Sequence, residues 1–350
     1  MIAIRTHALG RLSPATIDDD ALAQLCCPHD GGRLHWSSPD GSELCCGENG
    51  HVFPVENGIP RLFVANTWPA GKDDITGTVQ AFYEETLFPN YDGLDTRDSL
   101  RSKAGAGMFG RMLDEQIPKG SKVLEIGCGT GQMTNFLAMT FGRTVIGADM
   151  CMSSLKLASD FRDRFGIANA HFVQVNLFRP PFAPASFDVV FSNGVLHHTS
   201  DCHAAFRSIA PLVKPGGVIM IGLYNWLGRL PTLWRRAMIE RFGRAAMLLD
   251  HRLRGMTEDP RQRAWYMDQY RHPHETRHKM DELLELLDAE GFDFTASVPI
   301  IGDVEFSEQV ALFETASPGS RMDRLSTEVE MLLSGGKDGG LFIMAGRRRN

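Results

Sequence analysis

Residues 122–133, KVLEIGCGTGQM, decide the fold of this chain. The segment opens with VLEI, apolar side chains around a single acid, which predicts a buried strand. Three glycines follow at every second position, Gly127, Gly129 and Gly131, and residues without Cβ atoms predict a tight turn that lets a ligand approach the backbone. The residues after the turn predict a helix, so that the ligand would meet the helix N-terminus. Strand, glycine turn and helix in this order indicate an α/β fold.

The spacing of the glycines separates this loop from the dinucleotide-binding kind. That fingerprint is G-x-G-x-x-G, whereas here Gln132 stands where its third glycine would be and Glu125 precedes the first glycine by two residues. A second predicted strand, TVIGAD, ends at Asp149, where an acid can accept hydrogen bonds from both hydroxyls of a ribose. Loop and acid together favour a ribose-bearing ligand over a surface aspartate that merely ends a strand.

The same alternation of apolar strand, turn and amphipathic helix continues along the chain. Further strands are predicted within residues 171–176, 187–198 and 212–225, and another in GLFIMAGRRR near the C-terminus. Repeated strands and helices are typical of a parallel sheet with helical crossovers. We therefore expect the main domain to occupy residues 121–350.

Composition narrows the classes of function. The chain has 350 residues, seven cysteines and a formal net charge of −7, and its pI is near 5.9. A net negative charge offers no overall attraction for a polyanion. The composition therefore does not favour nucleic-acid binding. Unpatterned cysteines suit a reducing compartment, and the sequence shows neither a signal-peptide pattern nor a long apolar run. We expect a cytoplasmic protein without a transmembrane segment, and the sequence leaves its oligomeric state open.

Four motifs in order resemble the class I S-adenosylmethionine-dependent methyltransferases, particularly the branch with quinone and sterol methyltransferases. They are E-x-G-C-G-T-G, G-A-D, F-D-V-V-F-S-N-G-V-L-H-H and K-P-G-G, spread over roughly residues 115–225. The resemblance implies a Rossmann-like sheet of seven strands, the last of them antiparallel, and S-adenosylmethionine as the cofactor. It also implies that S-adenosylhomocysteine is the product.

The resemblance assigns cofactor roles by position. Glu125, Gly127, Gly129 and Gly131 would hold the methionine end, Asp149 the ribose and Asn193 the amino-acid moiety. Asn176 stands where the family usually has an aspartate facing the adenine, and its side-chain carbonyl can accept the same hydrogen bond. The aromatic segment VQAFYEETLFPNYDG is expected to close the pocket through Tyr83 and Tyr91, with core packing as the competing interpretation of these rings.

Methyl transfer asks the protein to align the acceptor, to exclude water and, for a hydroxyl or acidic carbon, to remove a proton. His197 and His198 follow the fourth strand, where the family places the transferred methyl, and an imidazole titrates near neutrality. Each is a candidate base. Capping of the next helix or packing under the cofactor is an equally favoured role for each.

Two insertions are expected, at about residues 226–278 and 300–338. The first begins with an arginine-rich segment that predicts an amphipathic lid helix, or alternatively a peripheral contact with anionic lipid. It ends in WYMDQYRHPHETRH, which supplies most of the predicted acceptor contacts. The predicted acceptor contacts are Tyr224 of the fifth strand and, from this segment, Tyr270, Arg271, His272 and His274. His274 and His278 could share a helix face and bind a metal, which we rank below a substrate-lining role.

Residues 20–64 form a small module between a tail, residues 1–19, and a linker and lid, residues 65–120. They resemble the Trm112-like zinc ribbon: Cys27 and Cys46 keep the first ligand of each knuckle, whereas Asp30 and Asn49 occupy the second positions. FPVENGIPRL is nearly intact. Since structural zinc takes four S or N ligands, we expect no bound zinc, unless His29, His51, Cys26 and Cys45 compensate with altered geometry.

Three functions remain open. The acidic pI and the aromatic, histidine-rich insertion favour a methyltransferase acting on a small, partly hydrophobic metabolite at an O, N or C atom. The ribbon favours a methyltransferase acting on RNA or protein, with the module as a docking element. An inactive S-adenosylmethionine-binding protein is the third alternative.

Overall fold

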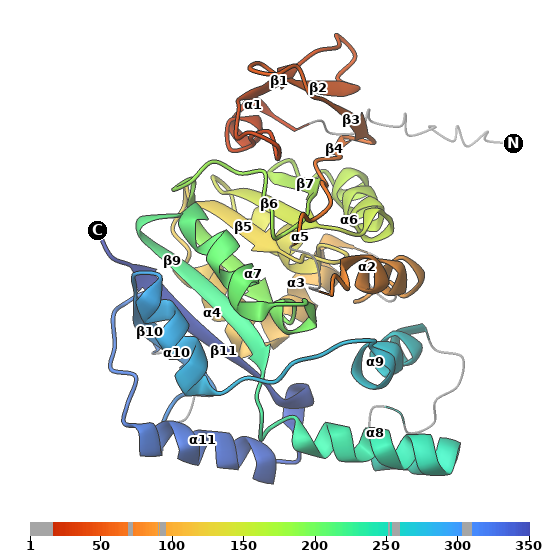
Figure 1. Cartoon of the computed structure of the whole chain (residues 1–350), viewed down its shortest axis with the longest axis vertical. Helices are drawn as coiled ribbons and strands as arrows, with labels where there is room; N and C mark the ends of the chain where they lie inside the picture. The colour runs from red at the N-terminus through yellow and green to blue at the C-terminus, as the bar shows by residue number, and fades with distance from the viewer. Residues whose placement is uncertain are drawn as a thin grey trace, which may run out of the picture.

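The computed structural model describes residues 17–68, 73–89, 91, 96–250, 253, 260–302 and 310–350, which fold into two sheets (Figure 1). The larger has seven strands in the order β10-β11-β9-β8-β5-β6-β7. Its first five strands in the chain are β5 (Lys122–Ile126), β6 (Thr144–Asp149), β7 (Ala170–Gln174), β8 (Phe187–Asn193) and β9 (Val213–Tyr224). The last two are β10 (Phe292–Val298) and β11 (Leu341–Arg348).

The pairing confirms the predicted fold class. All neighbours among the first five strands are parallel, and β11 inserts antiparallel between β9 and β10. A seven-stranded sheet with an antiparallel last strand is the arrangement expected from the four motifs. Because the five parallel strands run in one direction, their carboxyl ends meet at one edge, where ligands bind in open α/β sheets.

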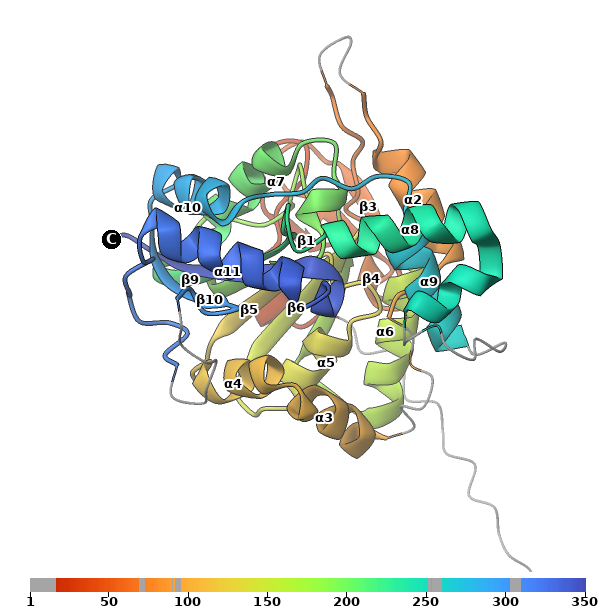
Figure 2. The same cartoon turned by 90° about the horizontal axis from the view of Figure 1, so that it is seen from below.

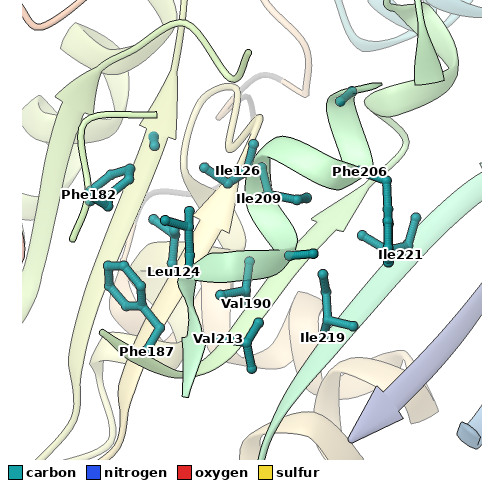
Figure 3. Close-up of a cluster of buried hydrophobic side chains, with 14 of the residues drawn as sticks. Leu124, Ile126, Phe182, Phe187, Val190, Phe206, Ile209, Val213, Ile219 and Ile221 are labelled. Atoms are coloured by element: carbon teal, nitrogen blue, oxygen red, sulfur yellow. The ribbon is translucent and has the colours of Figure 1, made fainter. Parts of the chain in front are cut away.

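Helices cover both faces of the sheet because its strands are apolar on both sides. Leu124 and Val190 belong to the cluster drawn in Figure 3, which also contains Phe206 of the covering helix α7. Val123 and Val189, one residue earlier on the same strands, pack in a second cluster on the opposite face. The first face is covered by α7 (Cys202–Ile209) and α10 (Met280–Ala289), the second by α4 (Met108–Gln116), α5 (Gln132–Ala138) and α6 (Met152–Phe165), with α3 (Arg97–Ala106) against α4 and α5.

The N-terminal module is a four-stranded antiparallel meander beside the β7 edge of the main sheet (Figure 1). Its elements are α1 (Asp19–Leu22), β1 (Leu34–Trp36), β2 (Glu43–Cys46), β3 (Val52–Glu56) and β4 (Ile59–Pro60). The Leu62 N–H donates to the Gln174 carbonyl of β7 over 2.9 Å, and the Cys26 N–H donates to the Pro181 carbonyl over 2.9 Å. Buried residues of the module, Leu44 among them, belong to the same core cluster as the main sheet.

The remaining helices gather near the carboxyl edge of the sheet (Figures 1 and 2). They are α2 (Thr76–Glu85), α8 (Leu230–Phe242), α9 (Pro260–Arg271) and α11 (Arg321–Leu333), with short 3-10 turns at Leu196–His198, Ala210–Leu212, Gly243–Leu249 and Lys337–Gly340. Within the described residues, no helix combines the length and apolarity that a membrane span needs. Most of the predicted N-terminal tail, part of the linker and part of the second insertion lie outside the described residues.

We predict that Leu62→Ala lowers the free energy of unfolding by about 2–5 kcal/mol, the usual range for truncating a buried leucine. Leu62 is 0% exposed and joins the module to the β7 edge. Leu333→Ala is the matched control, because Leu333 is 77% exposed, and it should change stability by less than about 0.5 kcal/mol. Chemical denaturation measures both. Equal effects would show that the module does not share the core.

Candidate functional site

A cavity of about 720 Å³ opens at the carboxyl edge of the sheet. Its floor is formed by the glycine loop after β5 and by the ends of β6, β8 and β9. Its walls come from α2, the segment around Phe88, and α9. The lining is mostly apolar with a few polar groups, which is the usual character of a site for small molecules.

The glycine loop lies as bare backbone under this cavity. Gly127, Gly129 and Gly131 all have positive φ, at 75°, 51° and 67°, a conformation that glycine adopts without strain. A Cβ atom added to Gly127 would lie 2.3 Å from Val195 Cγ2, and one added to Gly129 would lie 2.6 Å from the Phe88 carbonyl oxygen. Side chains at these two positions would therefore clash with residues that line the cavity, whereas Gly131 lies outside the lining and packs against Phe172 and Ala158.

Two buried acids stand beside the loop. The Asp149 carboxylate accepts hydrogen bonds from the N–H groups of Gly129 over 2.8 Å and Cys151 over 2.9 Å. Burial raises the pKa of Asp149 above its usual range. Glu125 pairs with the Thr134 hydroxyl, and burial raises the pKa of Glu125 to about 8. Burial therefore favours the protonated form of Glu125.

Both predicted asparagines line the cavity. Asn193 is exposed at the end of β8. Asn176 donates to the Val64 carbonyl over 2.8 Å and to Asn66 Oδ1 over 2.7 Å, and it accepts the Phe178 N–H over 3.0 Å. Since both amide protons are engaged, only the second lone pair of its carbonyl is open to a ligand donor.

The two tyrosines of the aromatic segment lie in different environments. Tyr83 lines the cavity, and its hydroxyl donates to Asp268 Oδ1 over 3.1 Å. Tyr91 is not among the lining residues: its ring stacks on Phe161 with centroids 4.4 Å apart, and its hydroxyl accepts from Asn135 over 2.9 Å. Tyr91 thus has the core-packing role, and Phe88 with Pro89 occupies the cavity wall in its place.

Of the two adjacent histidines, only one lines the cavity. His198 lines the cavity, and its Nδ1–H donates to the His274 carbonyl over 2.8 Å. That bond leaves Nε2 as the ring's lone-pair nitrogen. His197 is 0% exposed and lies behind Tyr224, with ring centroids 3.9 Å apart and its Nδ1 accepting the Tyr224 N–H over 3.3 Å. Burial holds the pKa of both imidazoles well below the usual value.

Of the five predicted acceptor contacts, only Tyr224 lines the cavity. Tyr270 points to a separate cluster, where its hydroxyl donates to Asp250 over 2.7 Å, and Arg271 is exposed and donates to the Tyr266 hydroxyl. His272 stacks behind His198 at a centroid distance of 3.7 Å. His274 contributes its carbonyl to His198 rather than its ring to the cavity.

The predicted residues of α9 miss the cavity because they lie on the wrong face of the helix. In α9 the residues facing the cavity are Trp265, Asp268 and Gln269, which recur at i, i+3 and i+4 as one helix face requires. Tyr270 follows immediately and therefore faces away. Asp268 and Gln269 are functional candidates that the sequence interpretation missed, although their spacing from Trp265 was the signal that could have found them.

The helix ends at Arg271, and residues 272–278 continue as an extended strap. His274 and His278 therefore share no helix face, contrary to the metal-binding alternative. His278 instead pairs with Asn225 beyond β9. Its Nδ1 and the Nε2 of His203 lie 2.9 and 2.6 Å from the same Glu282 oxygen, which are hydrogen-bond lengths.

A methyltransferase domain model matches residues 117–286, and a Trm112p-like model matches residues 18–58. The chain contains a methyltransferase domain, at residues 117–286. The topology and the glycine loop agree with this assignment, and the Trm112-like segment coincides with the N-terminal meander.

Two relatives match only part of this chain. An uncharacterized protein of Synechococcus, syc1184_c, is 30% identical over 53% of this chain and 44% of its own length. The ubiquinone/menaquinone biosynthesis C-methyltransferase UbiE of Vibrio campbellii is 35% identical over 29% of this chain and 40% of its own. The chain thus spans less than half of these relatives. A chain from the complex of the Haloferax volcanii Trm112 methyltransferase activator with a methyltransferase is 16% identical, with a TM-score of 0.46, covering 79% of this chain and 99% of that chain.

In the Trm112-like segment, the residues brought together differ from the predicted set. Cys27, Asp30, Cys46 and His51 place one ligand atom each within 4.8 Å of the others. His51 takes the fourth place, whereas Asn49 donates to Asp30 over 2.8 Å as a neighbour of the set. Three separations are 3.5 Å for Cys27 Sγ to His51 Nδ1, 3.4 Å for Cys46 Sγ to Asp30 Oδ1 and 3.1 Å for His51 Nδ1 to Asp30 Oδ2.

These donors fit zinc in type, and two of the three separations, all but the 3.1 Å between His51 and Asp30, fit it in spacing. Tetrahedral zinc bound at about 2.0–2.3 Å separates neighbouring ligand atoms by roughly 3.3–3.8 Å. One feature favours a knuckle pair held without metal. Asp30 already joins the knuckles by accepting from the Gly32 N–H over 2.8 Å and from Asn49.

We predict that protein purified without added metal carries well under one zinc ion per chain, because hydrogen bonds to Asp30 already connect the two knuckles. Elemental analysis of the intact chain is the measurement. Stoichiometric zinc would contradict this expectation and show that the four donors form a metal centre. In that case His51→Ala should release the metal, and His29→Ala, which removes a ring stacked on His51, should not.

Proposed function

We propose that this chain is an S-adenosylmethionine-dependent methyltransferase acting on a small, partly hydrophobic acceptor. The observation that carries the proposal is one continuous cavity, which runs from the glycine loop and Asp149 to a wall of Tyr83, Tyr224 and His198. The volume of about 720 Å³ falls in the range of small-molecule and cofactor sites. A polymer would instead require an open trough with a basic lining.

The residues at the floor suit the cofactor. The bare loop admits a ligand against its backbone, and Asp149 offers carboxylate oxygens to ribose hydroxyls. Glu125 would hold the methionine end, where a ligand ammonium would favour its ionised form over the protonated one that burial imposes. Asn193 would complete the amino-acid contacts, and Asn176 retains one lone pair for the adenine.

The cofactor supplies an already activated methyl group. The protein's own task is to align the acceptor and keep water out, which the aromatic walls from α2, β9 and α9 serve. Where the acceptor loses a proton, His198 Nε2 would take it, because Nδ1 is held by the His274 carbonyl. His197, behind Tyr224, would support that wall.

The ribbon module is better suited to supporting this site than to recruiting a polymer. The segment leaving the module carries Val64 and Asn66, whose oxygens orient the Asn176 side chain. The module also shares its core with the main sheet. A macromolecular acceptor remains the alternative, and methylation detected only with RNA or protein would establish it.

Asp149→Ala is expected to weaken binding of S-adenosylhomocysteine by about 1.5–3 kcal/mol, the usual contribution of hydrogen bonds to a charged group. Calorimetric titration measures the affinity. Asp188→Ala is the control: this acid lies on β8, outside the cavity lining, and pairs with Lys214. The proposal fails if the wild type binds no cofactor product or if the two variants bind it equally well.

His198→Ala should lower kcat by about 10²–10⁴-fold, the usual contribution of a general base, with cofactor affinity unchanged. Burial lowers the pKa of His198 well below 6.5. The imidazole therefore stays unprotonated, and kcat stays constant, as the pH falls to 6.5; kcat should decline only below that pH. Release of S-adenosylhomocysteine measures turnover. His203→Ala, half-exposed and off the cavity, is the control; an intact rate in His198→Ala would assign that residue to packing.

A further inference from the structure

The acceptor end of the cavity contains an acid that the function described so far does not use. Asp268 is 5% exposed and lines the cavity. Its Oδ1 accepts the Tyr83 hydroxyl over 3.1 Å, and its Oδ2 accepts the Gln269 amide over 2.8 Å. Within the described residues, no arginine, lysine or histidine lies within ion-pairing distance of it.

This placement is imposed by its neighbours. The Gln269 Oε1 is held by Arg229 over 2.5 Å, which turns the Gln269 amide nitrogen toward Asp268 and the Tyr224 hydroxyl, the latter at 2.9 Å. Tyr83 reaches the carboxylate from α2. The two donors are neutral, and the Arg229 guanidinium nearby pairs with Glu275 and reaches Asp268 only through Gln269. Burial raises the pKa of Asp268 above its usual value, so a cationic donor on a ligand would favour the ionised carboxylate.

The walls around the carboxylate are aromatic. Tyr83, Tyr224 and Trp265 all line the same cavity. A carboxylate framed by aromatic rings is the combination that attracts ammonium groups, through hydrogen bonds and through the electron-rich ring faces. It repels carboxylate and phosphate groups, because burying two like charges together is unfavourable.

We propose that Asp268, with Tyr83 and Gln269, forms the polar end of the acceptor site and selects a substrate that carries an amine or hydroxyl donor, not an anionic group. This rests on the proposed methyltransferase function and names the substrate class of the same cavity. Asp268 is a specificity-determining residue, and Arg229 acts through Gln269 as a positioning residue.

Three probes that share one ring test the selection: benzylamine, benzyl alcohol and benzoate. Titration into the full chain saturated with S-adenosylhomocysteine should show benzylamine or benzyl alcohol binding at least about tenfold tighter than benzoate, as a hydrogen bond to a charged group implies. Preference for benzylamine over benzyl alcohol would identify an amine substrate, and the reverse a hydroxyl substrate. Both outcomes support the proposal, whereas benzoate binding as tightly as the other two would overturn it.

Variants separate the acceptor site from the cofactor site. Asp268→Asn keeps the shape of the side chain and removes its charge, so the selectivity should fall to within about threefold while affinity for S-adenosylhomocysteine stays unchanged. Asp188→Asn is the matched control, because Asp188 lies on β8 outside the cavity lining and pairs with Lys214. Unchanged selectivity in Asp268→Asn would overturn the proposal. Loss of cofactor-product binding in the wild type would instead count against the methyltransferase function itself.

Discussion

The ion pair between Arg229 and Glu275 is the interaction on which the acceptor side of the site depends. Both charges are buried, with side-chain exposures of 0% and 8%, and they meet at 2.6 Å. The same guanidinium donates to the Gly339 carbonyl and lies over the Tyr224 ring at 3.7 Å. Because an unpaired buried charge is strongly unfavourable, the chain before α8, the strap after α9 and the turn before β11 have to keep their relative positions.

The Arg229–Glu275 ion pair explains how the first insertion can form a well-defined wall of the cavity. Apolar packing alone tolerates sliding of one helix past another, whereas hydrogen bonds from a charged group are directional. Arg229 engages both the side chain and the backbone carbonyl of Gln269, so the orientation of α9 beside the cavity follows from it. The strap then returns to β9 through His278 and presents the His274 carbonyl to His198. The ring orientation of a candidate base is thus set by backbone that lies far from it in sequence.

The opposite side of the cavity depends on the Trm112-like module within the same chain. The Leu62 N–H extends the hydrogen bonding of the β7 edge, and the residues that follow hold Asn176. The module therefore contributes to the cofactor side through backbone geometry, whatever its metal content. Its two knuckles are also joined through Asp30, which accepts hydrogen bonds from both of them.

Local patterns in the sequence were sufficient for the fold and for the floor of the site. Alternating apolar strands and helices predicted a parallel sheet, and the resemblance carried by the four motifs implied its seven strands. Glycines with Asp149 predicted the ligand edge, because backbone conformation and strand ends are encoded within a few neighbouring residues. The acceptor wall was different. Tyr91, Tyr270 and Arg271 had the right chemistry but point elsewhere, whereas Asp268 and Phe88 line the cavity. Which face of a helix meets a cavity, and which of two adjacent histidines does, is decided by packing between segments distant in the chain. Only the tertiary structure contains that information, because contacts such as Arg229 with Glu275 exist only once the segments have come together.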